Sequence, residues 1–364
     1  MTARKNLPAE NTENNKGHNL LRRSFAGLGP GLITGAADDD PSGISTYSVA
    51  GAAYGYATLW IALLTFPLMA AIQLMCARLG MVTGRGLAAA VRIYYPRWVL
   101  WGACTILVSA NVINIGADLG GMADATQLIT GIPALFWIPF YAFFIIGLLV
   151  WTSYKLIAKI FKWLTLVLIA YVLASFYAHV DWRHALAVTF VPHLEWSRGF
   201  LAVLVAILGT TISPYLFFWQ AAEALRPLAG DGAYLLFTVG LIGTGMLGVP
   251  VLVGSCAYAV AEGAAWRGSM ADKPKRARKF YAVMAVAMAL GLALNFAGFN
   301  AVKMLFWAAV INGLLAPPLI LLVILLTSNS KVMGQRVNSP LLRYLGWATF
   351  GVMTAAAVGM LIIS

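Results

Sequence analysis

About ten apolar segments separated by short polar linkers limit what this chain of 364 residues can fold into. A helix needs roughly 20 apolar residues to cross a bilayer, and most of the segments reach that length. Since 61% of the residues are hydrophobic and only 10% are charged, no soluble domain could bury the apolar surface. Because a helix satisfies its own backbone in lipid, the segments should be helices. They are predicted at residues 25–51, 56–80, 98–129, 135–152, 156–178, 199–225, 232–262, 279–299, 301–327 and 341–363.

The rest of the composition bears on domain organisation and on excluded functions. Residues 1–22 form a polar tail without an apolar core, so we expect a cytoplasmic tail, not a cleaved signal, followed by one transmembrane domain, residues 23–364. The three cysteines lie inside apolar segments and predict neither disulfides nor a zinc site. The net charge of +12 indicates membrane orientation rather than nucleic-acid binding. With no catalytic constellation visible, we expect neither an enzyme nor a cofactor.

The first segment carries three adjacent acidic residues in its middle: Asp38, Asp39 and Asp40. A carboxylate at membrane depth costs about 3 kcal/mol even on lenient scales, so such residues usually face a partner or a cavity. Pro41 lacks an N–H and disfavours helical geometry before it, and Gly43 tolerates most backbone angles. The pattern predicts a helix that breaks within the membrane and leaves carbonyl groups beside carboxylates, where a cation would bind. The alternative is a short loop outside the membrane.

A second interruption is expected in the sixth segment, where a polar patch separates two apolar runs. The patch contains Thr210, Thr211, Ser213, Pro214 and Tyr215. Interruptions at corresponding places in two inverted repeats are the best sequence pointer to a transporter's binding site.

Among the other polar residues within apolar segments, two are candidates for the site. Asp118, in the third, is either a proton or ion relay or a carboxylate satisfied by neighbouring helices. Asn312, in the ninth, either lines the site or makes a structural hydrogen bond.

Basic residues orient the first half of the chain but conflict with simple alternation in the second half. Arg22, Arg23 and the linker Arg85–Arg97 place the N-terminus and the loop after the second segment inside. Alternation then places the basic runs Arg267–Lys279 and Lys331–Arg343 outside, against the positive-inside rule. One additional crossing between about 217 and 232 would correct both loops. Either a crossing is missing there, or one segment does not span, and the sixth is the best candidate.

The two interruptions together resemble the Nramp family of divalent-metal transporters, which have the LeuT-type fold. Asp40-Pro41-Ser42-Gly43 stands at the place of the family's Asp-Pro-Gly-Asn motif, and Ser213-Pro214-Tyr215 at the place of its Met-Pro-His motif. The forms DDPSGI and TTISPYLFFWQ look like the Nramp-related magnesium-transporter branch. The resemblance covers about residues 27–327. It implies an all-α inverted-repeat bundle of about ten transmembrane helices, with the first and sixth broken.

The departures from the family pattern bear on the ion and on proton coupling. The family's metal-binding Met is Ser213 here, and hydroxyl and carboxylate oxygens favour hard ions such as Mg²⁺. The motif's Asn is Gly43 and its His is Tyr215. Asp118 matches the Asp of the family's third-helix Asp-Leu-Ala-Glu pattern, whose Glu position is Gly121 here. These differences favour weakly coupled or uncoupled transport.

Motif order bears on the charge conflict as well. Residues 217–220 look like the family's sixth helix, and residues 222–227 look like the stretch just before its eighth. The seventh helix would then be missing, with a deletion near 220–232 and the junction near Gln220–Glu223.

The resulting hypothesis is a carrier of divalent cations, Mg²⁺ or Mn²⁺, working by alternating access in the inner membrane of a bacterium. We expect a monomer embedded in the lipid bilayer, with the metal as substrate. The alternatives are a sodium-coupled amino-acid carrier of the same fold and a non-transporting remnant. The expected metal ligands are Asp40, Ser42, Gly43, Thr211 and Ser213, and the expected lining residues are Asp38, Asp39, Pro41, Pro214, Tyr215, Asp118 and Asn312.

Overall fold

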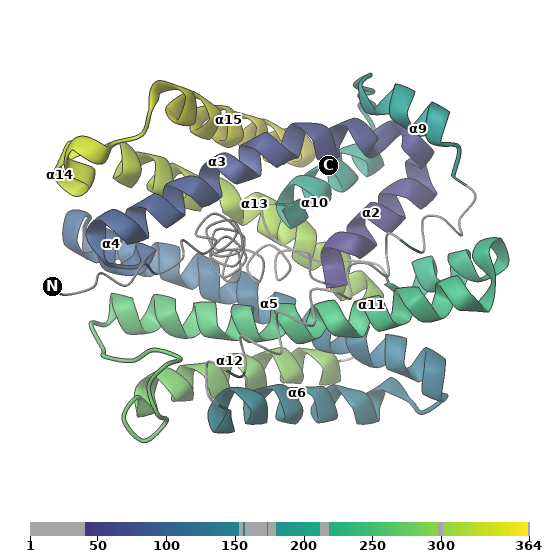
Figure 1. The fold of residues 1–364 in the computed structure, drawn as a ribbon, viewed down its shortest axis with the longest axis horizontal. Coiled ribbons are helices and arrows are strands. Elements are labelled where there is room, and N and C mark those ends of the chain that lie inside the picture. Colours follow the sequence, from purple (N-terminus) through teal and green to yellow (C-terminus); the bar gives the residue numbers. More distant parts are fainter. Residues whose placement is uncertain are drawn as a thin grey trace, which may run out of the picture.

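The structure is a computed structural model that describes residues 41–152, 156, 173, 180–211, 218–297 and 301–362; side chains 42, 44, 45, 48, 218–239, 241 and 301–303 are outside the description. Asp38, Asp39, Asp40, Ser213, Pro214 and Tyr215 therefore lie outside the described residues, as does most of the predicted fifth segment. Within the described ranges every regular element is helical (Figure 1). The elements are α2 Pro41–Tyr54, η1 Gly55–Thr58, α3 Leu59–Thr83, α4 Leu87–Tyr94, α5 Arg97–Thr130, α6 Ala134–Trp151, α9 Trp182–Thr189, α10 Arg198–Thr211, α11 Phe218–Gly263, α12 Arg278–Phe296, α13 Ala301–Ser328, α14 Ser330–Met333, η3 Gly334–Arg336 and α15 Pro340–Ile362.

The long helices confirm most of the apolar segments read from the sequence. Helices α3, α5, α6, α12, α13 and α15 each match a predicted segment to within three residues. Among the described residues, seven stretches are long and apolar enough to cross a membrane. α10 is not one of them, because it has only 14 residues and spans about 21 Å, against a hydrocarbon core of about 30 Å.

Glycine ends two of these helices in the left-handed conformation. Gly84 after α3 has φ 62° and its N–H donates to the Gly80 carbonyl, and Gly131 after α5 has φ 72° and donates to the Gln127 carbonyl. A residue with a Cβ is disfavoured at this geometry, so these glycines fix where the chain leaves each helix.

α5 lies at the centre of the bundle and contacts α6, α11, α12 and α13 (Figure 1). One apolar core joins these five helices, and a second joins α3, α10, α13 and α15. α13 contributes to both cores and so connects the two halves of the molecule. Large apolar side chains such as Phe143 and Leu361 are exposed on the outer surface, as expected for helices that face lipid.

The basic loops after α3, α11 and α13 lie together at one end of the molecule, which we call the basic end. The Ala89 N–H donates to Glu262 Oε2 at 3.2 Å, which joins α4 to the last turn of α11. Tyr94 Oη donates to the Lys331 carbonyl at 3.3 Å, which joins α4 to the segment after α13. The charge-based expectation that these loops share one side is therefore confirmed, and strict alternation of the predicted segments is wrong.

The error lies in how the sixth and seventh segments divide the chain. They were predicted at 199–225 and 232–262, but Phe218–Gly263 is one helix, and only Arg198–Thr211 belongs to α10. α10 begins at the end opposite the basic end, where Trp60 Nε1 donates to the His193 carbonyl, and α11 finishes at the basic end. A short α10 agrees with a sixth segment that does not span, and the missing crossing stays a prediction, because residues 212–217 lie outside the description.

Candidate functional site

The described part of the first interrupted segment begins in the middle of the bundle. Pro41, the first residue of α2, is buried, and a Cβ placed on Gly245 of α11 would lie 3.0 Å from the Pro41 ring and would overlap Met122 of α5. Gly245 therefore allows α2, α5 and α11 to meet closely at this point.

A hydrogen bond links the described parts of the two interrupted segments. Tyr47 Oη of α2 lies 2.7 Å from Thr211 Oγ1 of α10. Because the Thr211 hydroxyl donates to the Ile207 carbonyl at 2.8 Å, the tyrosine hydroxyl is the donor in the first bond. The bond thus joins a residue that follows the first predicted break, Tyr47, to one that precedes the second, Thr211. The breaks themselves lie outside the described residues.

α5 contributes a buried polar stripe to the same region. Asn111, Asn114 and Asp118 lie at helical spacing, and Asn114 and Asp118 are fully buried. Asn114 Oδ1 accepts a hydrogen bond of 2.9 Å from Asn312 Nδ2 of α13, and Asn111 Nδ2 donates to the Leu252 carbonyl of α11 at 3.3 Å. Buried polar groups in a membrane bundle are costly unless paired, so the stripe forms specific bonds between α5, α11 and α13.

α10 and α13 approach so closely that their backbones touch. A Cβ on Gly209 would lie 2.5 Å from the Ala309 carbonyl oxygen and 2.6 Å from the Gly313 nitrogen. A Cβ on Gly313 would lie 2.6 Å from the Val205 carbonyl oxygen. Thr211 follows Gly209 by two residues, and Asn312 directly precedes Gly313. The contact between the two glycines therefore places Thr211 and Asn312 at a similar depth in the bundle.

The structure thus brings together four predicted residues: Pro41, Asp118, Thr211 and Asn312. Pro41 and Met122 both lie against Gly245, and Met122 is one helical turn beyond Asp118, while Asn312 is bonded to Asn114, one turn before Asp118. Gly43 is buried on α2. For Asn312 the predicted structural hydrogen bond is present, and its role in lining a site stays a prediction. The roles of Ser42 and of the predicted residues outside the description also stay predictions.

Sequence reasoning missed three residues of this region. Thr46 of α2 is buried, and its hydroxyl has no hydrogen-bond partner among the described residues. The other two are Tyr47, which bonds to Thr211, and Thr244 of α11, which is fully buried. The helical spacing of Gly43, Thr46 and Tyr47 after the Asp-Pro-Ser motif was the available signal, because it places them on one face.

We expect Tyr47→Phe and Thr211→Val each to lower stability by about 1 kcal/mol, because each removes the bond between α2 and α10. The double variant loses the shared bond only once. Its loss of stability should therefore exceed that of Tyr47→Phe only by the contribution of the intrahelical bond from Thr211 to Ile207. Thermal unfolding of the purified protein in detergent measures this. Thr189→Val is the matched control, since the Thr189 hydroxyl also donates to the carbonyl four residues earlier, on α9. Fully additive losses would contradict the α2–α10 bond.

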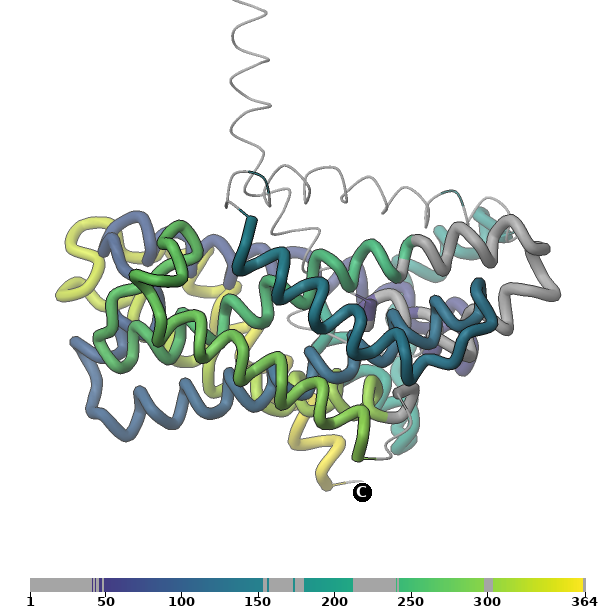
Figure 2. The backbone as a smooth tube through the Cα atoms, turned by 90° about the horizontal axis from the view of Figure 1, so that it is seen from below, coloured from purple at the N-terminus to yellow at the C-terminus, as the bar shows by residue number. Residues whose placement is uncertain are grey.

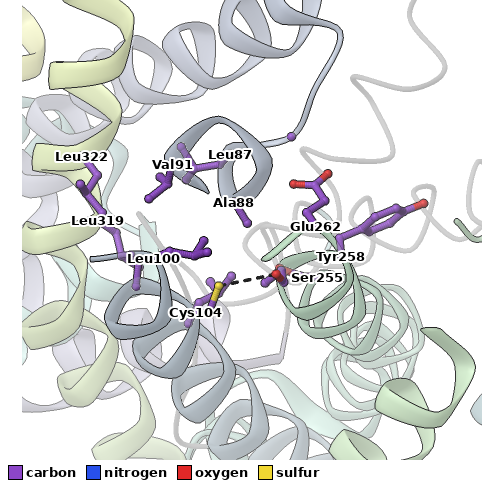
Figure 3. Close-up of a pocket in the computed structure, with 14 residues that line it drawn as sticks. Leu87, Ala88, Val91, Leu100, Cys104, Ser255, Tyr258, Glu262, Leu319 and Leu322 are labelled. Atoms are coloured by element: carbon purple, nitrogen blue, oxygen red, sulfur yellow. Dashed lines mark hydrogen bonds between the residues drawn. The ribbon is translucent and has the colours of Figure 1, made fainter. Parts of the chain in front are cut away.

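A separate cavity of about 380 Å³ lies at the basic end, between α4, α5, α11 and α13 (Figure 3). Its lining is mostly apolar, and Glu262 is the one acidic side chain among the described residues that line it. The carboxylate of Glu262 lies over Gly86, where a Cβ would overlap it, and it accepts the Ala89 N–H at the start of α4. Glu262 therefore caps α4 from a neighbouring helix. Among the described residues, no group of three or more His, Cys, Asp or Glu side chains lies close enough to hold a metal ion.

The helices and the buried polar core define a multi-pass membrane protein of the LeuT type, as predicted. A crystal structure of a variant of the Eremococcus coleocola manganese transporter matches with a TM-score of 0.67 over 92% of this chain and 85% of that one. A second structure of that transporter, in complex with an aromatic bis-isothiourea compound, matches with a TM-score of 0.58. At 17% and 16% sequence identity these likenesses show the fold alone.

The sequence gives the family. The family model described as natural resistance-associated macrophage protein-like matches residues 31–223 and 220–363, which is most of the chain. The chain belongs to the Nramp family, which confirms the resemblance drawn from the two motifs. The two matched stretches meet at residues 220–223, where the sequence placed the junction left by a missing helix.

Similar proteins include two named divalent metal cation transporter MntH. The one from Mesorhizobium japonicum is 32% identical over 203 residues, covering 54% of this chain and 44% of that protein. The one from Erwinia tasmaniensis is 33% identical over 221 residues, covering 57% and 50%. The chain thus spans about half the length of the relatives it matches.

Proposed function

We propose that this chain carries divalent metal cations, Mg²⁺ or Mn²⁺, across a bacterial inner membrane by alternating access. The observation that carries the proposal is the direct bond between α2 and α10, the described parts of the two motif-bearing segments, beside the buried polar stripe of α5. Relatives named divalent metal cation transporters and a fold neighbour named a manganese transporter support the substrate class.

The proposed metal site combines residues of the two family motifs. Asp40 is the principal ligand, Asp38 and Asp39 set a negative potential, and the Ser213 hydroxyl completes the site with carbonyl groups near Ser42 and Thr211. Pro41 fixes the backbone beside Asp40, and its close approach to Gly245 of α11 holds this end of α2 in place. Oxygen ligands without a thioether favour a hard ion.

Proton coupling should be weak or absent in this scheme. The family motif's His is Tyr215 and the acidic position after Asp118 is Gly121, so two titratable groups are replaced. Asp118 is fully buried next to the Asn114–Asn312 pair and is the remaining acidic side chain of that pattern. We assign it a lining role.

A second candidate function, a non-transporting remnant of the fold, is favoured by one observation. The two matched stretches of the family meet at 220–223, and α10 is too short to cross a bilayer by itself. Loss of the seventh helix would leave the second inverted repeat incomplete, and alternating access depends on movement of one repeat against the other.

Uptake into proteoliposomes separates the two candidates. Vesicles that contain the purified chain and an internal fluorescent reporter should take up Mn²⁺ faster than protein-free vesicles, and excess external Mg²⁺ should compete. An imposed pH gradient should change the rate little. A monodisperse, cooperatively unfolding protein that gives no uptake above protein-free vesicles would contradict the carrier and leave the remnant. Competition by amino acids would instead indicate the amino-acid carrier.

A further inference from the structure

A second cavity, of about 370 Å³, forms an apolar groove between α5, α11 and α12. Its α12 wall is a stripe at helical spacing that begins with a lysine: Lys279, Ala282, Val283, Val286, Ala287 and Leu290. The stripe is about 17 Å long, close to the depth of one leaflet of a bilayer. Val286 and Leu290 are more than half exposed, and α12 lies in an outer layer of the bundle (Figure 2). The groove therefore opens to the hydrocarbon.

A glycine crossing closes the deep end of this groove. A Cβ on Gly116 of α5 would lie 2.8 Å from the Gly291 carbonyl oxygen of α12, so the two helices touch there. Every residue of α5 and α12 that lines the groove lies on the basic side of this contact. The space between the helices thus extends from the middle of the membrane toward the basic end.

Positive charge gathers at the mouth of the groove. The loop and the start of α12 carry six basic residues against one acidic residue, Asp272, and all six are exposed. They are Arg267, Lys273, Lys275, Arg276, Arg278 and Lys279. Lys279 itself lines the groove, and its ammonium lies 4.9 Å from the ring centre of Trp266, which also lines it. A tryptophan beside a lysine at this depth is typical of the headgroup region.

The first turn of α12 adds a second source of positive potential. It contains no acidic residue, and its N-cap residue Ala277 makes no side-chain hydrogen bond to the helix. Helix N–H groups and the macrodipole favour an anion at this end, whereas Arg278 and Lys279 are unfavourable there unless a negative charge is near. The positive-inside rule explains a basic loop, but it does not explain a lysine that lines an apolar groove.

We propose that this groove binds one anionic phospholipid, with its acyl chain between α5 and α12 and its phosphate at Lys279 and the N-terminus of α12. The ligand combines an apolar chain with a negative headgroup, which are the two features that the groove and its mouth complement. The site is separate from the proposed metal site and does not depend on transport.

Native mass spectrometry of the purified chain with added phosphatidylglycerol or phosphatidylcholine tests the headgroup. The wild type should retain phosphatidylglycerol preferentially. Lys279→Gln should weaken that retention about fivefold, since one basic residue near the membrane surface contributes about that factor. Lys331→Gln is the matched control, because Lys331 lies at the same basic end but does not line the groove. Equal retention of both lipids, or equal losses in both variants, would overturn the proposal.

Filling the groove tests the chain of the lipid without changing any charge. Ala282→Trp places a large ring in the groove and should lower phosphatidylglycerol retention at least as much as Lys279→Gln. Val358→Trp on α15 is the control, since Val358 is also exposed and apolar but does not line the groove. Retention unchanged by Ala282→Trp would mean that the basic mouth attracts anions diffusely, and the groove would not be the site.

Discussion

Asp40→Ala is expected to lower Mn²⁺ uptake into proteoliposomes by about tenfold to a hundredfold or more. Loss of a group that only supports the metal ligands typically costs a factor in this range, and loss of a ligand should cost at least as much. The reason is charge: in the proposed site Asp40 is the principal anionic ligand, and the next residue in the sequence, Pro41, is buried at the start of α2. Asp40→Asn should fall between wild type and Asp40→Ala, because the amide retains an oxygen ligand but loses the charge.

The control for this experiment is Asp181→Asn. Asp181 accepts the N–H groups of Arg183 and His184 as the N-cap of α9, at the end of the molecule opposite the basic end. An asparagine caps a helix equally well, so the variant removes one acidic charge without loss of structure. Its uptake should equal that of the wild type. Undiminished uptake in Asp40→Ala, with normal expression and folding, would remove Asp40 from the ligand set and with it the proposed site.

Helix positions could be predicted from the sequence because each depends on local composition. The apolar run 98–129 became α5, Arg97–Thr130, since a helix is the only lone segment that satisfies its backbone in lipid. The division of residues 199–262 could not be predicted in the same way. Apolar runs of similar composition flank residues 211–218, and nothing in local hydropathy shows that only 14 residues belong to α10 and 46 to α11.

In the candidate site, too, single residues could be predicted from the local sequence, but contacts between distant residues could not. Asp118 and Asn312 could be singled out because polar residues are rare in apolar segments, and both are buried at the centre of the bundle. The pairing of Asn312 with Asn114, 198 positions away, and that of Tyr47 with Thr211 required the packing of helices against one another. The loop charges did carry such information, since the basic runs after α11 and α13 indicated one common side before any contact between them was known.

Gly209→Ala, at the crossing of α10 and α13, should lower the free energy of unfolding by about 1–3 kcal/mol or more. A methyl group on Gly209 would overlap the Ala309 carbonyl oxygen and the Gly313 nitrogen, at 2.5 and 2.6 Å. These are backbone atoms and cannot rotate aside, so the helices must separate. Since Thr211 follows two residues later and Asn312 precedes Gly313, separation should also lower metal uptake.

Gly351→Ala is the matched control for the α10–α13 crossing, because it makes the same chemical change on α15 at an exposed position where a Cβ meets no atom within 4 Å. Alanine favours a helix over glycine by about 1 kcal/mol, so the unfolding temperature of this variant should stay the same or rise. The temperature of Gly209→Ala should fall, as monitored by tryptophan fluorescence during heating in detergent. If the two variants unfold at the same temperature, α10 and α13 are not in backbone contact. The short helix would then be free to shift along α13, and its bond to Tyr47 could not define the position of Thr211.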